Sequence, residues 1–303
     1  MKIIQGDCIE VMAGMAAGSV DTCVTSPPYF GLRDYGCDGQ VGLESTPDEY
    51  VAKMVEVFRG VKRVLWNEGT VWLNLGDSYS SNPATGAKIG GESYRGGGIK
   101  PKDLIGIPWR VAFALQADGW YLRQDIIWHK PNPMPESVTD RCTKAHEYIF
   151  LLSKSQRYYY NAEAIKEENS GSLPFGDKDT FKMNDDRAQG KHGKGSMFSG
   201  GSRQEYIDKY YTNGRNKRSV WTVTTKPYSG AHFATFPPDL IEPCILAGCP
   251  EGGTVLDPFM GSGTTIMVAE KNGCNGIGIE LNEDYIKIAN DRLSDCQSLF
   301  KCK

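Results

Sequence analysis

Apolar side chains along this chain follow two patterns, helical spacing in some stretches and short β-rich runs in others. Residues 47–66 carry apolar side chains at roughly helical spacing and are followed by Gly69, which predicts an amphipathic helix. Strands are predicted where short runs end at Gly, Pro, Asp or Ser, over residues 2–5, 20–24, 70–75, 121–129, 147–152, 253–256 and 276–279. Further helices are predicted over residues 9–17, 103–117, 238–247, 266–271 and 282–293.

The order of these elements predicts the fold class. Strands and helices alternate up to residue 160, which is typical of an α/β protein with a doubly wound, mostly parallel sheet. Residues 161–230 break the pattern, because they are polar, rich in Gly and without clear periodicity. We therefore predict a seven-stranded sheet built from residues 1–160 and 231–303, with residues 161–230 as an insert.

Composition narrows the class of protein. Of the 303 residues, 40% are hydrophobic and 23% are charged, as is ordinary for a globular protein. No apolar run approaches the ~18 residues of a membrane span, and the N-terminus has no signal-peptide pattern, so we expect a soluble cytoplasmic protein with no membrane partner. The nine cysteines include no Cys-x-x-Cys pair, which argues against a zinc site and against a disulfide framework.

The distribution of charge bears on possible partners. The chain has a formal net charge of −3, so a nucleic acid would have to bind a local basic surface. Residues 161–230 hold 12 Lys or Arg against 9 Asp or Glu, a net +3, with Arg215, Lys217 and Arg218 grouped and tyrosines interleaved. Cations among aromatic rings suit nucleic acid, through phosphate contact and base stacking. An ordinary solvated insertion is the alternative.

A glycine loop, residues 257–265, stands where a predicted strand turns into a predicted helix. Glycines there let a ligand approach the backbone, and the helix N-terminus offers unpaired N–H groups. No Lys follows Gly263 and Ile266 replaces a third glycine, so neither a nucleoside-triphosphate loop nor a dinucleotide fingerprint is supported. An adenosine-containing ligand without a polyphosphate remains, and Glu280, 17 residues after Gly263, suits its ribose hydroxyls. The alternative is a tight turn with a solvated Glu280.

A second informative segment, Thr-Ser-Pro-Pro-Tyr-Phe at residues 25–30, directly follows the predicted strand 20–24. Two consecutive prolines remove two backbone donors and fix φ, so the strand must end there and its exit loop is stiff. Such a loop offers a hydroxyl, free carbonyls and a flat ring, which suits a planar heteroaromatic with an exocyclic amino group. A proline turn with a surface tyrosine is the alternative.

Together these segments give the chain a resemblance to a known family. Residues 25–29, the polar insert and residues 257–263 resemble the DNA amino-methyltransferases, in the order of their β group. Trp-Leu-Asn-Leu-Gly-Asp at 72–77, Trp-His-Lys-Pro-Asn-Pro at 128–133 and His-Phe-Ala-Thr-Phe-Pro at 232–237 extend the resemblance over nearly the whole chain. It implies a Rossmann-like methyltransferase fold in permuted order, S-adenosylmethionine as cofactor, and methylation of N4 of cytosine or N6 of adenine in duplex DNA.

The resemblance implies a role for each residue of the proline loop, residues 26–29. The amino nitrogen of a base is a poor nucleophile, because its lone pair is delocalised into the ring. Ser26 and the carbonyl of Pro27 would accept the amino hydrogens. Pro28 would keep the loop stiff, and Tyr29 would stack on a base flipped out of the duplex. Methyl transfer would be direct and in line, with alignment and fixed dipoles providing most of the acceleration.

The resemblance also implies which residues hold the cofactor, and that no metal is needed. The glycine loop would surround S-adenosylmethionine, with Asp257 near the methionine ammonium and Glu280 on the ribose. Asp7 would lie near the adenine ring. The full set of implied cofactor residues is Asp7, Phe236, Pro237, Asp257, Phe259, Gly261, Gly263, Thr264 and Glu280. The implied division of the chain is a catalytic half (1–160), a target-recognition insert (161–230) and a cofactor-binding half (231–303).

The choice of base is inferred from one position of the proline loop. Adenine enzymes of this group usually carry Asp where this chain has Ser26, and Ser-Pro-Pro-Tyr is typical of N4-cytosine enzymes, so we favour cytosine. N6-adenine methylation is the alternative, because a hydroxyl and a carboxylate can both accept the hydrogen bond. A catalytically silent DNA-binding module is a remoter alternative. The expected partners are duplex DNA and a cognate restriction endonuclease, and the protein is expected to be a monomer or a homodimer.

Overall fold

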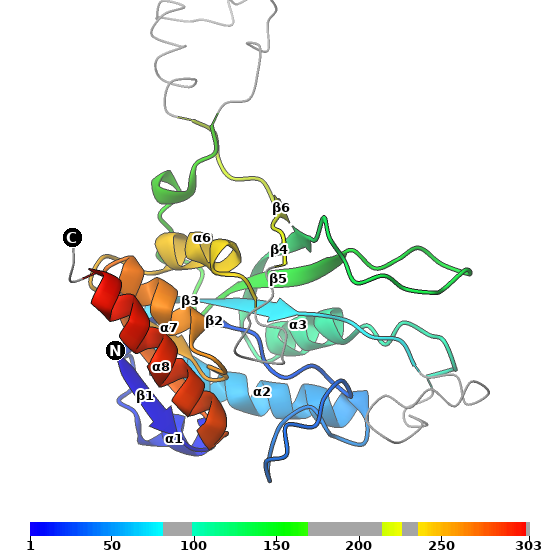
Figure 1. The fold of residues 1–303 in the computed structure, drawn as a ribbon. Helices are drawn as coiled ribbons and strands as arrows, with labels where there is room; N and C mark the ends of the chain where they lie inside the picture. Colours follow the sequence, from blue (N-terminus) through cyan, green and yellow to red (C-terminus); the bar gives the residue numbers. More distant parts are fainter. Residues whose placement is uncertain (81–98, 169–213, 226–235, 301–303) are drawn as a thin grey trace, which may run out of the picture. The chain divides into compact units, whose positions relative to one another are not determined.

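Figure 1 shows the fold as a computed structural model. The parts of the chain that the structure describes are residues 1–80, 99–168, 214–225 and 236–300, with side chains up to residue 294. The chain divides into two compact units, one made of Met1–Asn161 and Ser219–Lys303 and the other of Ala162–Arg218. The sheet and its helices belong to the first unit.

The described residues of the first unit form one eight-stranded sheet. From one edge to the other its strands are β1 (Lys2–Gln5), β8 (Asn275–Glu280), β7 (Thr254–Asp257), β2 (Val20–Thr25), β3 (Leu65–Leu75), β5 (His146–Ser153), β4 (Tyr121–His129) and β6 (Val220–Thr222). Neighbouring strands run parallel, except that β5 is antiparallel to both β3 and β4. The predicted α/β fold with a mostly parallel sheet is confirmed.

The prediction of seven strands missed β6, an edge strand that pairs with β4. It has three residues, and Trp221, its buried one, is paired in register with Trp128. A three-residue strand is too short to show an alternating pattern, and this one lies inside the stretch predicted to be insert. The compact second unit accordingly ends at Arg218, whereas the predicted insert ran to residue 230.

Helices cover both faces of the sheet (Figure 1). On one face α1 (Cys8–Gly14), α2 (Pro47–Val64) and α3 (Ile107–Ala117) pack in sequence order; on the other are α6 (Pro238–Gly248), α7 (Thr264–Lys271) and α8 (Glu283–Phe300). Within the described ranges, none of the helices is both long and apolar enough to cross a membrane.

Helix α2 illustrates why the predicted elements form. Thr46 accepts a hydrogen bond from the backbone N–H of Glu49, whose side chain in turn accepts one from the N–H of Thr46, and Pro47 occupies the first turn. The apolar face of α2 is fully buried in the core, with Tyr50 and Phe58 among its largest side chains. The helix is two residues shorter than predicted, because β3 begins at Leu65.

The described residues of the second unit include the short 3₁₀ helix η2 (Glu163–Ile165) and an isolated antiparallel bridge between Glu167 and Arg215. Two backbone hydrogen bonds of 2.9 Å close that bridge. Residues 169–213, which include most of the predicted recognition insert and three of its interleaved tyrosines, lie outside the described residues.

Candidate active site

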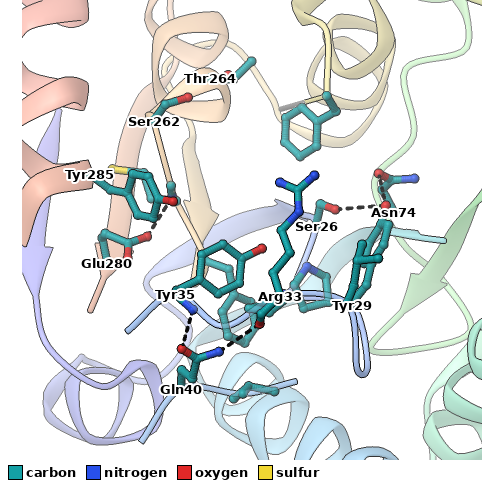
Figure 2. Close-up of a pocket in the computed structure, with 18 of the residues that line it drawn as sticks. Ser26, Tyr29, Arg33, Tyr35, Gln40, Asn74, Ser262, Thr264, Glu280 and Tyr285 are labelled. Atoms are coloured by element: carbon teal, nitrogen blue, oxygen red, sulfur yellow. Dashed lines mark hydrogen bonds between the residues drawn. The ribbon is translucent and has the colours of Figure 1, made fainter. Parts of the chain in front are cut away.

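A cavity of about 700 Å³ lies at the edge of the sheet where the parallel strands end. Asp7 follows β1, Ser26 follows β2, and Glu280 ends β8. Glu147 lies near the start of the antiparallel strand β5, so it reaches the same edge. Figure 2 shows Glu280 on one side of the cavity and Ser26 on the other, with the side chain of Arg33 between them. The fold thus brings the predicted cofactor and catalytic segments to one cavity.

The glycine loop forms part of the cavity wall. Gly261 and Gly263 have φ values of 54° and 79°, in the left-handed region that favours glycine. A Cβ at Gly261 would meet no atom within 4 Å, whereas a Cβ at Gly263 would lie 3.1 Å from the Cβ of Ala289 on α8. Gly261 therefore leaves open space for a ligand, and Gly263 lets helix α8 pack closely.

Asp257 is buried at the end of β7, with 1% of its surface exposed. Its Oδ1 accepts hydrogen bonds from the hydroxyl of Thr25 (2.7 Å) and the N–H of Phe259 (3.1 Å), and its Oδ2 accepts one from the hydroxyl of Thr265 (2.6 Å). Burial raises the pKa of Asp257 to about 6, although these hydrogen bonds oppose the rise. The carboxylate therefore joins strand β2 to the glycine loop.

Two other acidic residues, Glu280 and Asp7, line the cavity directly. The two carboxylate oxygens of Glu280 accept hydrogen bonds of 2.8 Å from the N–H groups of Gly261 and Asn282, and burial raises its pKa. Asp7 is the N-cap of α1, and its Oδ1 accepts from the N–H of Ile9 at 2.8 Å. Both side chains are thus fixed by backbone contacts.

The proline loop lies opposite, with all four of its residues on the cavity wall. The carbonyl of Pro28 accepts a 2.9 Å hydrogen bond from the hydroxyl of Tyr50 on α2, which holds the loop against the core. The hydroxyl of Tyr29 donates to Glu147 Oε2 at 2.7 Å, and the hydroxyl of Ser26 lies 3.5 Å from the Tyr29 oxygen. Burial raises the pKa of Tyr29 well above its ordinary value, so this hydroxyl stays protonated.

The structure sorts the predicted site residues into those that line the cavity and those that do not. On its wall are Ser26, Pro27, Pro28, Tyr29, Asp7, Phe236, Phe259, Gly261, Thr264 and Glu280. Asp257, Gly263 and Pro237 belong to the same segments but are not among the residues that line the cavity. The described contacts of Asp257 and Gly263 support the glycine loop.

Sequence reasoning missed a group of polar wall residues beside the proline loop: Asn74, Trp128, Lys130 and Glu147. The first three stand within the segments 72–77 and 128–133 that carry the family resemblance, so a signal was present. Glu147 pairs in register with Trp128, and its carboxylate forms an ion pair with Lys130. The antiparallel pairing of β5 with both β3 and β4 brings these side chains together.

A second missed group is the segment after the proline loop, where Arg33, Tyr35 and Gln40 line the cavity (Figure 2). Gln40 fixes this segment, because its side chain accepts from the N–H of Tyr35 (2.7 Å) and donates to the carbonyl of Arg33 (3.1 Å). The segment forms no regular element, so no periodicity in the sequence could have identified it.

The three cations predicted to bind DNA lie in the second unit, around the carboxylate of Glu167. Arg215 and Arg218 place their Nε atoms 3.3 and 3.1 Å from its Oε2, and the Nζ of Lys217 is 3.9 Å from its Oε1. Burial alone would raise the pKa of Glu167, but the hydrogen bonds and charge of Arg218, with the charge of Lys217, outweigh it and lower the pKa. Three cationic side chains of the described residues thus gather around Glu167.

Comparison with known proteins relates the chain to DNA methylases. A family model for N6 and N4 methyltransferases, described as DNA methylase, matches residues 20–291. The chain is 47% identical to the type II methyltransferase M.Cfr9I of Citrobacter freundii, over 96% of this chain and 87% of the relative. It is also 47% identical to the type II methyltransferase M.SmaI of Serratia marcescens, over 96% of this chain and 90% of the relative.

Solved structures with lower identity share the fold. The cytosine-N4-specific PvuII DNA methyltransferase has a TM-score of 0.63 at 17% identity, covering 97% of this chain and 90% of its own. The protein TTHA0409 of Thermus thermophilus, complexed with S-adenosyl-L-methionine, has a TM-score of 0.58 at 21% identity, covering 97% of this chain and 95% of its own. Since the family model spans most of the sequence and relatives of 47% identity match nearly all of it, the chain belongs to the N6/N4 family of DNA methylases.

Proposed function

We propose that this DNA methylase transfers a methyl group to N4 of cytosine in duplex DNA, with the target base flipped into the cavity beside the proline loop. The observation that carries the choice of base is Ser26, which stands at the amino-acceptor position of that loop. Ser-Pro-Pro-Tyr resembles the loop of N4-cytosine enzymes, and the PvuII enzyme, which is cytosine-N4-specific, has the same fold.

S-adenosylmethionine is the cofactor, and the glycine-loop side of the cavity suits it. The open space at Gly261 admits a ligand against the backbone, and the ring of Phe259 gives an apolar wall. The carboxylate of Glu280 can accept the ribose hydroxyls while it remains tied to the N–H of Gly261. When bound, S-adenosylmethionine supplies a methyl group on a positively charged sulfur.

On the opposite side, the proline loop would hold the target base. The Ser26 hydroxyl and the Pro27 carbonyl accept the two amino hydrogens, which turns the nitrogen lone pair out of the ring and toward the methyl group. The ring of Tyr29 stacks on the flipped base and offsets the cost of unstacking, a few kcal/mol. Gly76 closes one side of that ring, because a Cβ there would lie 2.5 Å from Tyr29 Cε2.

We propose that basic residues of the second unit contact the phosphates of the same DNA. Arg215, Lys217 and Arg218 gather around Glu167, and such cationic side chains are the ones that contact phosphates. We also propose a cognate restriction endonuclease, since the relatives are type II methyltransferases. DNA from cells that express this protein should then resist an endonuclease that cuts at the methylated sequence. Unchanged cleavage at every methylated site would contradict the expected protection.

The test of the reaction is to incubate the purified protein with methyl-labelled S-adenosylmethionine and duplex DNA and to digest the DNA to nucleosides. Label in N4-methylcytosine is the expected result. Label in N6-methyladenine would overturn the choice of base, and no label in DNA would overturn the activity. Tyr29→Ala serves as the inactive variant, and Ser19→Ala, at an exposed turn remote from the cavity, serves as the matched active control.

A further inference from the structure

The proline loop leaves one chemical problem unsolved in this chain. When an amino nitrogen takes up a methyl group it becomes positively charged and must release a proton. A carboxylate in the loop could take that proton, but this chain has the hydroxyl of Ser26, which is a poor base. The proton therefore needs another acceptor, and hydroxyl groups can pass it on if they are hydrogen-bonded in series.

Such a series runs from Ser26 to a carboxylate. The Ser26 hydroxyl is 3.5 Å from the oxygen of Tyr29, and the Tyr29 hydroxyl donates to Glu147 Oε2 at 2.7 Å. All three side chains line the cavity. Asn74 supports the end of the series, since its Oδ1 lies 3.2 Å from the Tyr29 hydroxyl and its Nδ2 lies 3.4 Å from Glu147 Oε2.

We propose that Glu147 accepts the proton that leaves the methylated amino group, through the hydroxyls of Ser26 and Tyr29. The bond from nitrogen to the methyl carbon forms as the carbon–sulfur bond breaks, and its electron pair stays on sulfur. The amino proton then moves to Ser26 Oγ, the Ser26 proton to the Tyr29 oxygen, and the Tyr29 proton to Glu147 Oε2. The product amine and Glu147 both end neutral, and Glu147 later loses its proton to water.

One link of the series is longer than the others. The 3.5 Å between Ser26 and Tyr29 exceeds an ordinary O–H···O distance by about 0.7 Å. Catalytic hydrogen bonds are often long without substrate and shorten when it binds. A base stacked on Tyr29 and bonded to Ser26 would bring the two hydroxyls together.

Basic side chains lie around Glu147. Lys130, directly after β4, forms an ion pair with the other carboxylate oxygen, Oε1. Lys144, just before β5, and His146, its first residue, also interact electrostatically with Glu147. The side chain of Glu147 is 15% exposed, so it is shielded from water yet able to exchange a proton afterwards. Tyr29 also contacts it, through the hydrogen bond already described.

The inference rests on amino-group methylation and holds for either base, so its failure is distinguishable from failure of the cytosine assignment. Single-turnover methylation rates are to be measured at saturating cofactor from pH 5 to 9 for the wild type, Glu147→Gln and Tyr29→Phe. Gln keeps an oxygen that can accept from Tyr29, and Phe keeps the stacking ring. We expect a wild-type rate that falls in acid, and variants at least ~100-fold slower that lack this acid limb.

The controls separate a proton acceptor from a structural anchor. Ser19→Ala, the exposed control used above, should keep the wild-type rate and its acid limb, and cofactor affinity measured by calorimetry should be unchanged in all variants. If Glu147→Gln retains both the rate and the acid limb while Glu147→Ala loses activity, Glu147 only positions Tyr29 and the proposal is wrong. A Tyr29→Phe variant with the wild-type profile would also overturn it.

Discussion

The hydroxyl of Thr25 donates a 2.7 Å hydrogen bond to the buried carboxylate of Asp257, 232 residues later in the chain. Thr25 ends β2 and is followed by the proline loop, while Asp257 ends β7 and begins the glycine loop. The same carboxylate also accepts from Phe259 and Thr265. One buried side chain therefore sets the spacing between the segment that holds the base and the segment that holds the cofactor.

Asp257 should make stability depend on pH. Its pKa is about 6 in the folded protein against 3.8 as an ordinary carboxyl, so the folded state holds the proton more tightly. Stability from this group is therefore greatest below pH ~4 and declines as pH rises through ~6, by roughly 3 kcal/mol. In Asp257→Asn this decline should be absent from the free energy of unfolding, measured in urea at several pH values.

A variant of a second carboxylate is needed as a control, because other acidic groups also titrate between pH 4 and 6. Asp291→Asn, at an exposed position of α8, should keep the wild-type pH dependence. An Asp257→Asn curve parallel to that of the wild type between pH 4 and 6 would show that the carboxylate is not held as described.

Gly76 gives a way to disturb the base side of the cavity alone. A Cβ there would lie 2.5 Å from Tyr29 Cε2 and 3.0 Å from its Cδ2, so Gly76→Ala must push the ring aside. Overpacking of this kind costs about 1–3 kcal/mol, so we expect methyl transfer to slow by about 10- to 100-fold. Single-turnover assays at saturating cofactor measure the rate, and calorimetry should give an unchanged cofactor affinity.

The matched control is Gly14→Ala in α1, where a Cβ would meet no atom within 4 Å. This variant should keep full activity. Equal rates for Gly76→Ala and the wild type would mean that Tyr29 is free to shift without loss, which contradicts a fixed stacking ring.

The sequence predicted those features of the fold that local chemistry determines. Helical spacing identified α2, and the Pro-Pro pair marked the end of β2 almost to the residue. Both loops of the cavity were predicted because proline fixes the backbone wherever it occurs, whereas glycine permits conformations that other residues rarely adopt. The fold class followed, since alternating strands and helices have few ways to pack.

Features that depend on pairing between distant segments could not be predicted in the same way. The hydrogen bond from Thr25 to Asp257 forms because β7 lies beside β2, which no local pattern indicates. Glu147 and Lys130 meet because β5 runs antiparallel to β4, which no local pattern indicates. Strand β6 exists only as an edge partner of β4 and has no pattern of its own.

Glu280 should govern cofactor affinity. Its two oxygens accept from the N–H groups of Gly261 and Asn282, so Glu280→Gln sets an amide N–H against one of these donors and removes the charge. Loss of a hydrogen bond to a charged group costs about 1.5–3 kcal/mol, so the Kd for S-adenosylmethionine should rise about 10- to 100-fold. Calorimetry measures it.

The pH dependence of that affinity has a definite sign. Burial raises the pKa of Glu280, so its carboxylate takes up a proton at a higher pH than an exposed one. Cofactor affinity should therefore fall as the pH is lowered, and this fall should be missing in Glu280→Gln. Glu283→Gln, at an exposed position of α8, is the control and should bind as the wild type does at every pH; a Glu280→Gln variant with wild-type affinity would contradict the ribose assignment.

The cluster around Glu167 should contribute to DNA affinity through charge. Arg218, with 67% of its side chain exposed, is the most accessible of the three cations. If it contacts a phosphate, Arg218→Ala should weaken binding about equally for all sequences and reduce the slope of log affinity against log salt by about 0.9. Glu167→Gln should have the opposite effect, because the carboxylate competes with phosphate for the same cations. Fluorescence anisotropy with a labelled duplex at several salt concentrations measures both, and Lys53→Ala on α2, remote from the second unit in sequence, is the control. An unchanged salt dependence of DNA affinity in Arg218→Ala would show that this cluster is not part of the DNA-binding surface.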